Sequence, residues 1–148
     1  MVLYLGTEAT LDTTTMSTES PAFYVGEPDE REAAVREHFS ASRAYYLGSH
    51  TGCGCGFEFG ADPEWLAWAR SDPEALGYDP DPDGPASRQS LADLLRALVD
   101  AGHPVELFAC WSGDDDVPPG HRSRIRPDAV LDPATVLEGH HLVVTDAP

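Results

Sequence analysis

Short apolar runs, separated by polar and glycine-rich segments, predict β-strands along the chain. Five such runs lie at residues 2–6, 21–26, 45–48, 105–111 and 141–145. A sixth strand is predicted at residues 123–126, where polar and apolar residues alternate. Runs of four to seven residues are typical strand lengths. Three of them end in Tyr-Leu-Gly or Tyr-Val-Gly, beginning at Tyr4, Tyr24 and Tyr46. Glycine at these ends allows the backbone to turn sharply.

Helical periodicity is clearest over residues 90–101. Ser90 can cap this segment, and Gly102 followed by Pro104 would end it. Leucines spaced three and four residues apart give it one apolar face: Leu91, Leu94, Leu95 and Leu98. An earlier helix is predicted over residues 28–39, and two Asp-Pro-Glu sequences predict further helix starts at Asp62 and Asp72.

The order of these elements indicates the fold class. A strand at 45–48, a helix at 90–101 and a strand at 105–111 follow the βαβ pattern, in which a crossover helix joins two parallel strands. The near-continuous apolar run at 105–111 is typical of a strand buried on both faces. We predict an α/β fold for residues 1–148, a single-domain sandwich around a mixed, partly parallel sheet, with a mobile acidic Pro/Gly loop at about 79–86.

The net charge of the chain limits the classes of binding partner that we expect. There are 26 acidic and 9 basic residues, a formal net charge of −17. Nucleic acid and anionic membranes require a basic patch, so neither is an expected partner. The arginines at residues 122–126 alternate along a predicted strand, which is more typical of a solvated face than of a phosphate site. The acidic surface instead suggests, as one hypothesis, docking on a basic protein partner.

The cysteine content predicts a reducing environment. Three cysteines occur without a recognisable secretion signal, because residues 1–5 lack preceding basic residues and Glu8 follows soon after. No apolar run approaches the roughly 20 residues of a membrane span. We therefore expect a cytoplasmic protein with free thiols.

The most unusual segment is residues 45–57, which reads Tyr-Tyr-Leu-Gly-Ser-His-Thr-Gly-Cys-Gly-Cys-Gly-Phe. His50 lies three residues before Cys53, and Gly54 separates Cys53 from Cys55. In parallel sheets, functional sites lie beyond the carboxyl ends of the strands. If strands 45–48 and 105–111 are parallel neighbours, His50, Cys53, Cys55 and Cys110 converge at one edge.

One hypothesis for these residues is a transition-metal site. One histidine and three cysteines, His50, Cys53, Cys55 and Cys110, would complete the tetrahedral shell of zinc. Cuprous copper also accepts soft thiolate ligands. Structural zinc sites usually have two or more residues between paired cysteines, and only one separates this pair.

A second hypothesis is thiol chemistry. Cys53 or Cys55 would be the nucleophile, its pKa lowered by backbone N–H groups of the glycine loop, with His50 as the base. The same pair could also form a strained, reactive disulfide. A third reading gives the cysteines no chemistry: free cysteines commonly pack as small apolar residues, which is the favoured reading for Cys110.

Two of these segments resemble parts of small uncharacterised bacterial proteins. The resemblance is carried by residues 45–57 and by residues 105–115, which include Leu-Phe-Ala-Cys-Trp-Ser-Gly-Asp. It implies no activity, and it implies only that the two segments belong to one unit.

Overall fold

The computed structural model describes residues 1–13, 23–30, 32–60, 64, 68, 71 and 81–146. Within them lies a six-stranded sheet of order β2-β3-β1-β4-β6-β5. Its strands are β1 (Val2–Thr7), β2 (Phe23–Gly26), β3 (Arg43–Ser49), β4 (Val105–Cys110), β5 (His121–Ile125) and β6 (His140–Val144). The helical elements are the 3₁₀ turns η1 (Glu32–His38), η2 (Gly54–Phe57) and η3 (Pro127–Leu131) and the α-helix α3 (Gly84–Asp100). The predicted α/β fold with a mixed, partly parallel sheet is confirmed.

The parallel strands are not the pair that the βαβ pattern predicted. β5 and β6 are parallel, whereas β1 lies between β3 and β4 and is antiparallel to both. Five of the six residues of β1 are buried, which suits a strand at the centre of a sheet. Because β3 and β4 each oppose β1, they still run in the same direction, but they are second neighbours.

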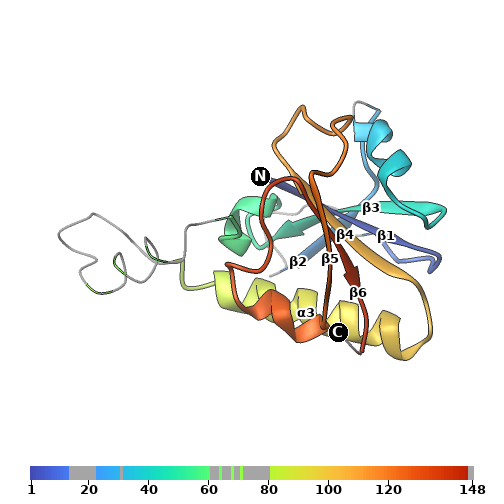
Figure 1. Ribbon diagram of the computed structural model, residues 1–148. Helices are drawn as coiled ribbons and strands as arrows, with labels where there is room; N and C mark the ends of the chain where they lie inside the picture. The colour runs from blue at the N-terminus through green and yellow to red at the C-terminus, as the bar shows by residue number, and fades with distance from the viewer. Residues whose placement is uncertain are drawn as a thin grey trace.

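The helix α3 covers one face of the sheet (Figure 1). Its buried leucines, Leu91, Leu95 and Leu98, belong to one apolar core with β-strand residues such as Leu3 and Leu107. The helix begins at Gly84 and not at the predicted Ser90. Pro85 lies in its first turn, where the missing N–H of proline has no helical partner to lose, so the Pro/Gly sequence starts the helix. Residues 84–86 of the predicted mobile loop are therefore helical.

The turn η1 lies on the opposite face of the sheet from α3 (Figure 1). Val35 and Phe39 pack there against Tyr4 and Phe108, as the apolar spacing of the predicted helix over residues 28–39 required. The described part of that helix is a 3₁₀ turn over Glu32–His38. The sheet is thus buried on both faces around β1 and β4.

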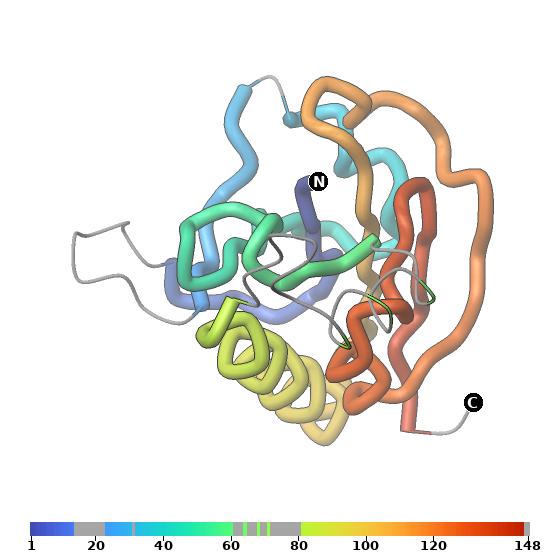
Figure 2. The backbone as a smooth tube through the Cα atoms, turned by 90° about the vertical axis from the view of Figure 1, so that its left-hand side faces the viewer, coloured from blue at the N-terminus to red at the C-terminus, as the bar shows by residue number. Residues whose placement is uncertain are grey.

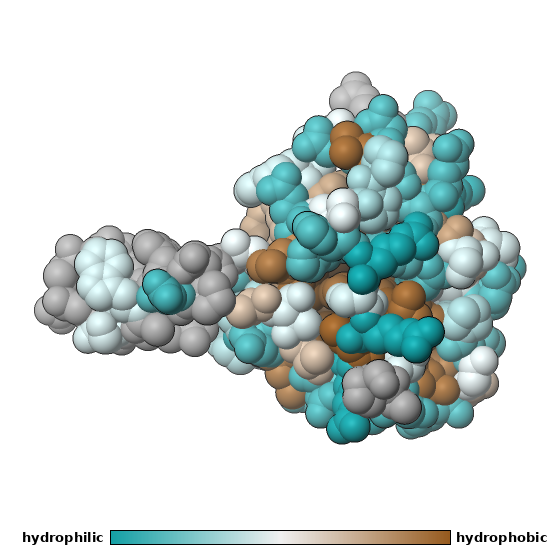
Figure 3. Space-filling view, viewed as in Figure 1, coloured by the Kyte–Doolittle hydropathy of each residue, from teal (hydrophilic) through white to brown (hydrophobic). Residues whose placement is uncertain are grey.

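Some predictions fall outside the described residues. These are the helix starts at Asp62 and Asp72 and the first two residues of the acidic loop, Asp79 and Pro80. In the part of the chain that the structure describes, no helix is long and apolar enough to cross a bilayer. The face shown in Figure 3 is mostly hydrophilic, with a small apolar area near its centre over β5 and β6, as the acidic composition leads us to expect.

A buried acid on β4 attaches the end of η1 to the sheet. One carboxylate oxygen of Glu106 accepts hydrogen bonds from the backbone N–H and hydroxyl of Ser40 and from the backbone N–H of Ala41. Its other oxygen lies 2.8 Å from Nε2 of His141. The two groups would form an ion pair only with His141 protonated, and neither ring nitrogen makes a well-directed hydrogen bond within the described residues. Burial lowers the pKa of His141, although the charge of Glu106 opposes the effect.

The lowered pKa of His141 predicts that the free energy of unfolding depends on pH. In the unfolded chain a histidine binds a proton near pH 6.5, and folded His141 binds it only at lower pH. The stability that this neutral histidine contributes is therefore fully present above about pH 6.5 and is lost as pH falls through its folded pKa. In His141→Gln, which has no titrating ring, the difference in unfolding free energy from wild type should shrink as pH falls from 8 to 5 in chemical denaturation. A constant difference over that range would contradict this.

Candidate functional site

The glycine–cysteine loop, residues 50–57, leaves the carboxyl end of β3 beside the start of β1. Gly52 has φ of 76°, a left-handed conformation that favours glycine. A Cβ on Gly54 would lie 2.6 Å from the backbone oxygen of Met1, so only glycine fits between the two cysteines here. The alternating glycines therefore allow the loop to fold tightly against the edge of the sheet.

The sulfur of Cys53 lies at the start of η2, where donors surround it. The backbone N–H of Cys55 donates to it over 3.2 Å, and the Thr51 hydroxyl lies 3.3 Å away. Burial alone would raise the pKa of the Cys53 thiol. The hydrogen bonds from the Cys55 thiol, from Thr51 and from the N–H groups of Cys55 and Gly56 outweigh burial and lower this pKa below its ordinary value. These contacts therefore favour the thiolate form of Cys53 over that of an ordinary cysteine.

Cys55 has the opposite character. The interaction of its thiol with the Cys53 sulfur, followed by burial and the negative charge of Cys53, raises the pKa of Cys55. The side chain is exposed, while that of Cys53 is half-buried. In this pair the Cys55 thiol therefore favours ionisation of Cys53 over its own ionisation.

Cys110 does not join this pair. It is 3% exposed, and its side chain lies on the η1 face of the sheet with Tyr4 and Phe108. Its sulfur is 3.8 Å from Oδ1 of Asp115. Burial, followed by the charge of that carboxylate, raises the pKa of Cys110 to about 12. Cys110 packs as a protonated, apolar residue, and the inserted strand β1 separates β4 from β3.

His50 points away from the cysteines and toward the start of α3. Its Nδ1 lies 3.0 Å from the hydroxyl oxygen of Ser87, and its Nε2 lies 2.9 Å from Oδ2 of Asp81. The Ser87 oxygen also accepts the backbone N–H of His50 over 3.0 Å. Among the described residues no hydrogen bond joins His50 to a cysteine. His50 therefore attaches the beginning of the loop to the helix.

The end of the loop is held by the next residue of the same helix. Arg88, which is 5% exposed, donates from Nη1 to the backbone oxygen of Phe57 and to Oε2 of Glu58, both over 2.9 Å. Its Nε donates to the backbone oxygen of Leu131 over 3.1 Å. Ser87 and Arg88 thus fix both ends of the loop, and Figure 2 shows the loop lying against the first turns of α3.

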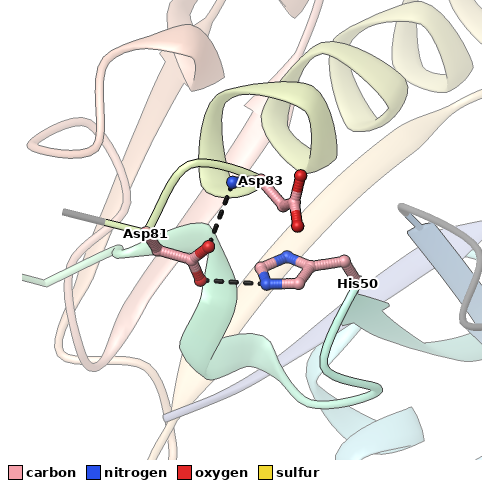
Figure 4. Close-up of side chains that lie close together, drawn as sticks. All are labelled: His50, Asp81 and Asp83. Atoms are coloured by element: carbon pink, nitrogen blue, oxygen red, sulfur yellow. Dashed lines mark hydrogen bonds and ion pairs between the residues drawn. The ribbon is translucent and has the colours of Figure 1, made fainter. Parts of the chain in front are cut away.

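One group of side chains has the geometry of a metal site. Ligand atoms of His50, Asp81 and Asp83 lie within 4.8 Å of one another, and they are the only such group of three or more His, Cys, Asp or Glu residues that the described residues contain. Figure 4 shows the two carboxylates beside the His50 ring. One imidazole and two carboxylates could hold a divalent ion such as zinc, with Ser87 orienting the ring. The structure does not bring His50, Cys53, Cys55 and Cys110 together as one ligand set.

A cavity of about 460 Å³ opens beside the two paired cysteines. Besides Cys53 and Cys55, its walls include Tyr24 and Glu27 near β2, Glu32 of η1 and Tyr46 of β3. A larger cavity, of about 640 Å³, lies at the opposite end of the sheet near Glu106 and His141 and contains no cysteine. We take the smaller cavity as the candidate site, because it holds the activated thiol.

Several residues of this site carry no sequence signal. Ser87 and Arg88 lie more than 30 residues from their loop partners and resemble any polar helix residues. Asp81 stands in an acidic run that predicts only solvation. Tyr24 and Tyr46 end predicted strands, so they could have been proposed to share an edge with the loop. Pairing of β2 with β3, which decides the matter, is not visible in the sequence.

Comparisons with known proteins give no further guide to this site. No protein-family model, no curated protein and no solved structure matches the chain significantly.

The thiol environments predict an order of reactivity. At pH 7, iodoacetamide should modify Cys53 first and Cys110 last, because thiolate is the reactive form. A pKa of about 12 leaves Cys110 at least about a thousandfold less thiolate than a thiol of pKa below 9. Peptide mapping by mass spectrometry after short exposures measures this order. Equal labelling of Cys53 and Cys110 in the folded protein would refute it.

The contacts of Ser87 predict a second effect. Ser87→Ala removes the acceptor of the His50 backbone N–H and the partner of its ring, which should lower the free energy of unfolding by about 1–3 kcal/mol. Hydrogen exchange should accelerate in the loop at residues 50–57. Ser90→Ala is the matched control, because its hydroxyl bonds only within the helix, to the Ala86 oxygen. If both variants exchange alike, Ser87 does not hold the loop.

Proposed function

We propose that the protein carries out thiol–disulfide exchange, with Cys53 as the attacking thiolate and Cys55 as the resolving thiol. The observation that carries this proposal is the set of polar groups around the Cys53 sulfur, the Cys55 backbone N–H and the Thr51 hydroxyl. The Cys55 thiol lowers the pKa of Cys53 further. A thiolate attacks disulfide sulfur much faster than a thiol does. The neighbouring cavity supplies space for a substrate.

In the first step the Cys53 thiolate attacks one sulfur of the substrate disulfide. A bond forms between Cys53 and that sulfur, the substrate S–S bond breaks, and the other substrate sulfur leaves as a thiolate. The hydrogen bonds that stabilised the Cys53 anion are then released, because the sulfur has lost its charge. Cys55 no longer donates to an anion, so its pKa can fall toward the ordinary value.

In the second step Cys55 loses its proton to the departed substrate thiolate and attacks the Cys53 sulfur. The bond between Cys53 and the substrate breaks, and the second substrate half leaves as a thiolate. The substrate has gained two electrons and the protein holds a Cys53–Cys55 disulfide. With one residue between the cysteines this bond is strained, and strained disulfides are readily reduced. The same strain opposes formation of the bond, so the cycle is driven by an excess of a small cellular thiol, which reduces the disulfide and returns the protein to its dithiol form.

This mechanism does not need His50 as a base. The Cys53 proton is already weakly held, because the loop backbone, Thr51 and Cys55 stabilise the anion. The ring of His50 is used to hold the loop through Ser87 and Asp81. His50 is thus a positioning residue, and a role in proton transfer is not part of the proposal.

Two other hypotheses stay as predictions. Zinc binding by Cys53 and Cys55 would require two further ligands, and the sulfur of Cys110 lies against Asp115 on the other face of the sheet. Docking of the acidic surface on a basic protein rests only on the net charge of −17. A cytoplasmic location agrees with the three free thiols, since the proposed reaction needs a reducing environment.

The proposal predicts distinct behaviour for the three single cysteine variants. With bis(2-hydroxyethyl) disulfide as substrate, Cys53→Ser should lose all reduction above the buffer background. Cys55→Ser should accumulate one mercaptoethanol adduct on Cys53, because the second step cannot occur. Cys110→Ser should react like wild type, provided that its circular dichroism shows a folded protein. Stopped-flow thiol release and intact-mass spectrometry measure these outcomes.

The same experiment separates this proposal from simple thiol exposure. A wild-type protein that reduces the disulfide no faster than an unfolded sample of the same chain would refute it. So would a Cys53→Ser variant that retains the wild-type rate.

A further inference from the structure

The cavity beside the cysteines is acidic and aromatic. Its walls carry two carboxylates, Glu27 and Glu32, and two phenol rings, Tyr24 and Tyr46. Among the described residues that line it no side chain is basic, and its one positive group is the α-ammonium of Met1, which acts on Cys55. Arg36 lies 3.6 Å from Glu27, but both side chains are more than half exposed, so this ion pair is screened by solvent. The two carboxylates outnumber the single α-ammonium, so the cavity is net negative even before the Cys53 thiolate is counted.

The pKa of Tyr46 agrees with a net negative charge in the cavity. Burial, followed by the negative charges of Cys53 and Glu32, raises the pKa of Tyr46 to about 12. Acidic groups from both η1 and the loop thus act on one phenol. Its oxygen donates a hydrogen bond to the backbone oxygen of Gly52 over 3.3 Å, which holds the ring at the cavity wall.

The aromatic rings add a second means of recognising a cation. Tyr46 contacts Tyr24 edge-on, with ring centroids 6.2 Å apart, and Tyr4 edge-on at 6.0 Å. These contacts fix the orientation of the Tyr46 ring. A cation over the face of a tyrosine is attracted by the negative charge of the π-system. Carboxylates and rings together suit an ammonium or guanidinium group.

Resting on the proposed exchange reaction, we propose that its substrate is a small disulfide with an ammonium group beside each sulfur. A volume of about 460 Å³ lies in the usual range for small-molecule sites. Attack by Cys53 requires an electron-poor sulfur at the loop, and the cation would then lie among Glu27, Glu32 and Tyr46. Disulfides that carry carboxylates would be repelled by the same groups and by the net charge of −17.

Three small disulfides of different charge test this inference. Cystamine is a dication, bis(2-hydroxyethyl) disulfide is neutral and 3,3′-dithiodipropionate is a dianion. Each rate is divided by the rate of dithiothreitol with the same disulfide, because a leaving thiol of lower pKa departs faster without any protein. We expect the normalised rate for cystamine to be about fivefold higher than that for bis(2-hydroxyethyl) disulfide. The normalised rate for 3,3′-dithiodipropionate should be lower than that for bis(2-hydroxyethyl) disulfide. The preference should diminish between 20 and 500 mM salt.

The variant Glu32→Gln locates the preference in the cavity. Glutamine keeps an oxygen to accept the Asp29 backbone N–H, so η1 retains its start. We expect this variant to lose most of the preference for cystamine and to keep the neutral rate. Glu37→Gln is the matched control, because Glu37 is an exposed acid of η1 that does not line the cavity, and it should keep the preference.

The possible failures are distinct. Equal normalised rates for the three wild-type reactions would overturn the cation inference and leave the exchange reaction standing. The cation inference would also be overturned if Glu32→Gln and Glu37→Gln reduced the preference for cystamine equally, because the preference would then come from the overall charge of the protein. Failure to reduce the neutral disulfide would refute the exchange reaction itself.

Discussion

The candidate site depends on two adjacent residues in the first turns of α3. Ser87 holds the start of the cysteine loop through His50, and Arg88 holds its end through the backbone of Phe57. The loop is rich in glycine and contributes one large apolar side chain, Phe57, to the core, so its own packing cannot fix its shape. α3 is itself fixed by its leucine face against the sheet. The hydrophobic core thus fixes the position of α3, and α3 in turn holds the two ends of the loop.

The residues that hold the loop are therefore different from the groups that contact the Cys53 sulfur. Donors to the Cys53 sulfur come from the loop itself, whereas the helix holds the two ends of the loop and Ser49 of β3 holds the Cys53 carbonyl. Backbone N–H groups stabilise an anion only while they remain aimed at it. The helix contacts therefore act on the thiol without touching it. Histidine, the residue that most resembles a catalytic base in the sequence, is used here as an anchor.

The sequence predicts the strands well because they depend on local apolar patterns. It places the start of α3 six residues late, since Gly84 and Pro85 resemble a loop although proline is accepted in a first helical turn. The neighbours of each strand depend on long-range pairing, so the position of β1 between β3 and β4 could not be read from order. That insertion is why Cys110 lies apart from the other cysteines. The direction of the His50 ring depended on Ser87, 37 residues away.

The acidity of the chain bears on both cysteine environments. Negative charge disfavours thiolates, and Asp115 beside Cys110 contributes to this effect by raising the pKa of that thiol. Cys53 lies in a chain of net charge −17 and near Glu32, and its pKa is lowered nonetheless. Short-range hydrogen bonds therefore outweigh the long-range field at this sulfur, since solvent and salt screen distant charges more than contacts. In the proposed exchange reaction the same field would act on an approaching disulfide, so the negative charge that opposes thiolate formation would also favour a cationic substrate.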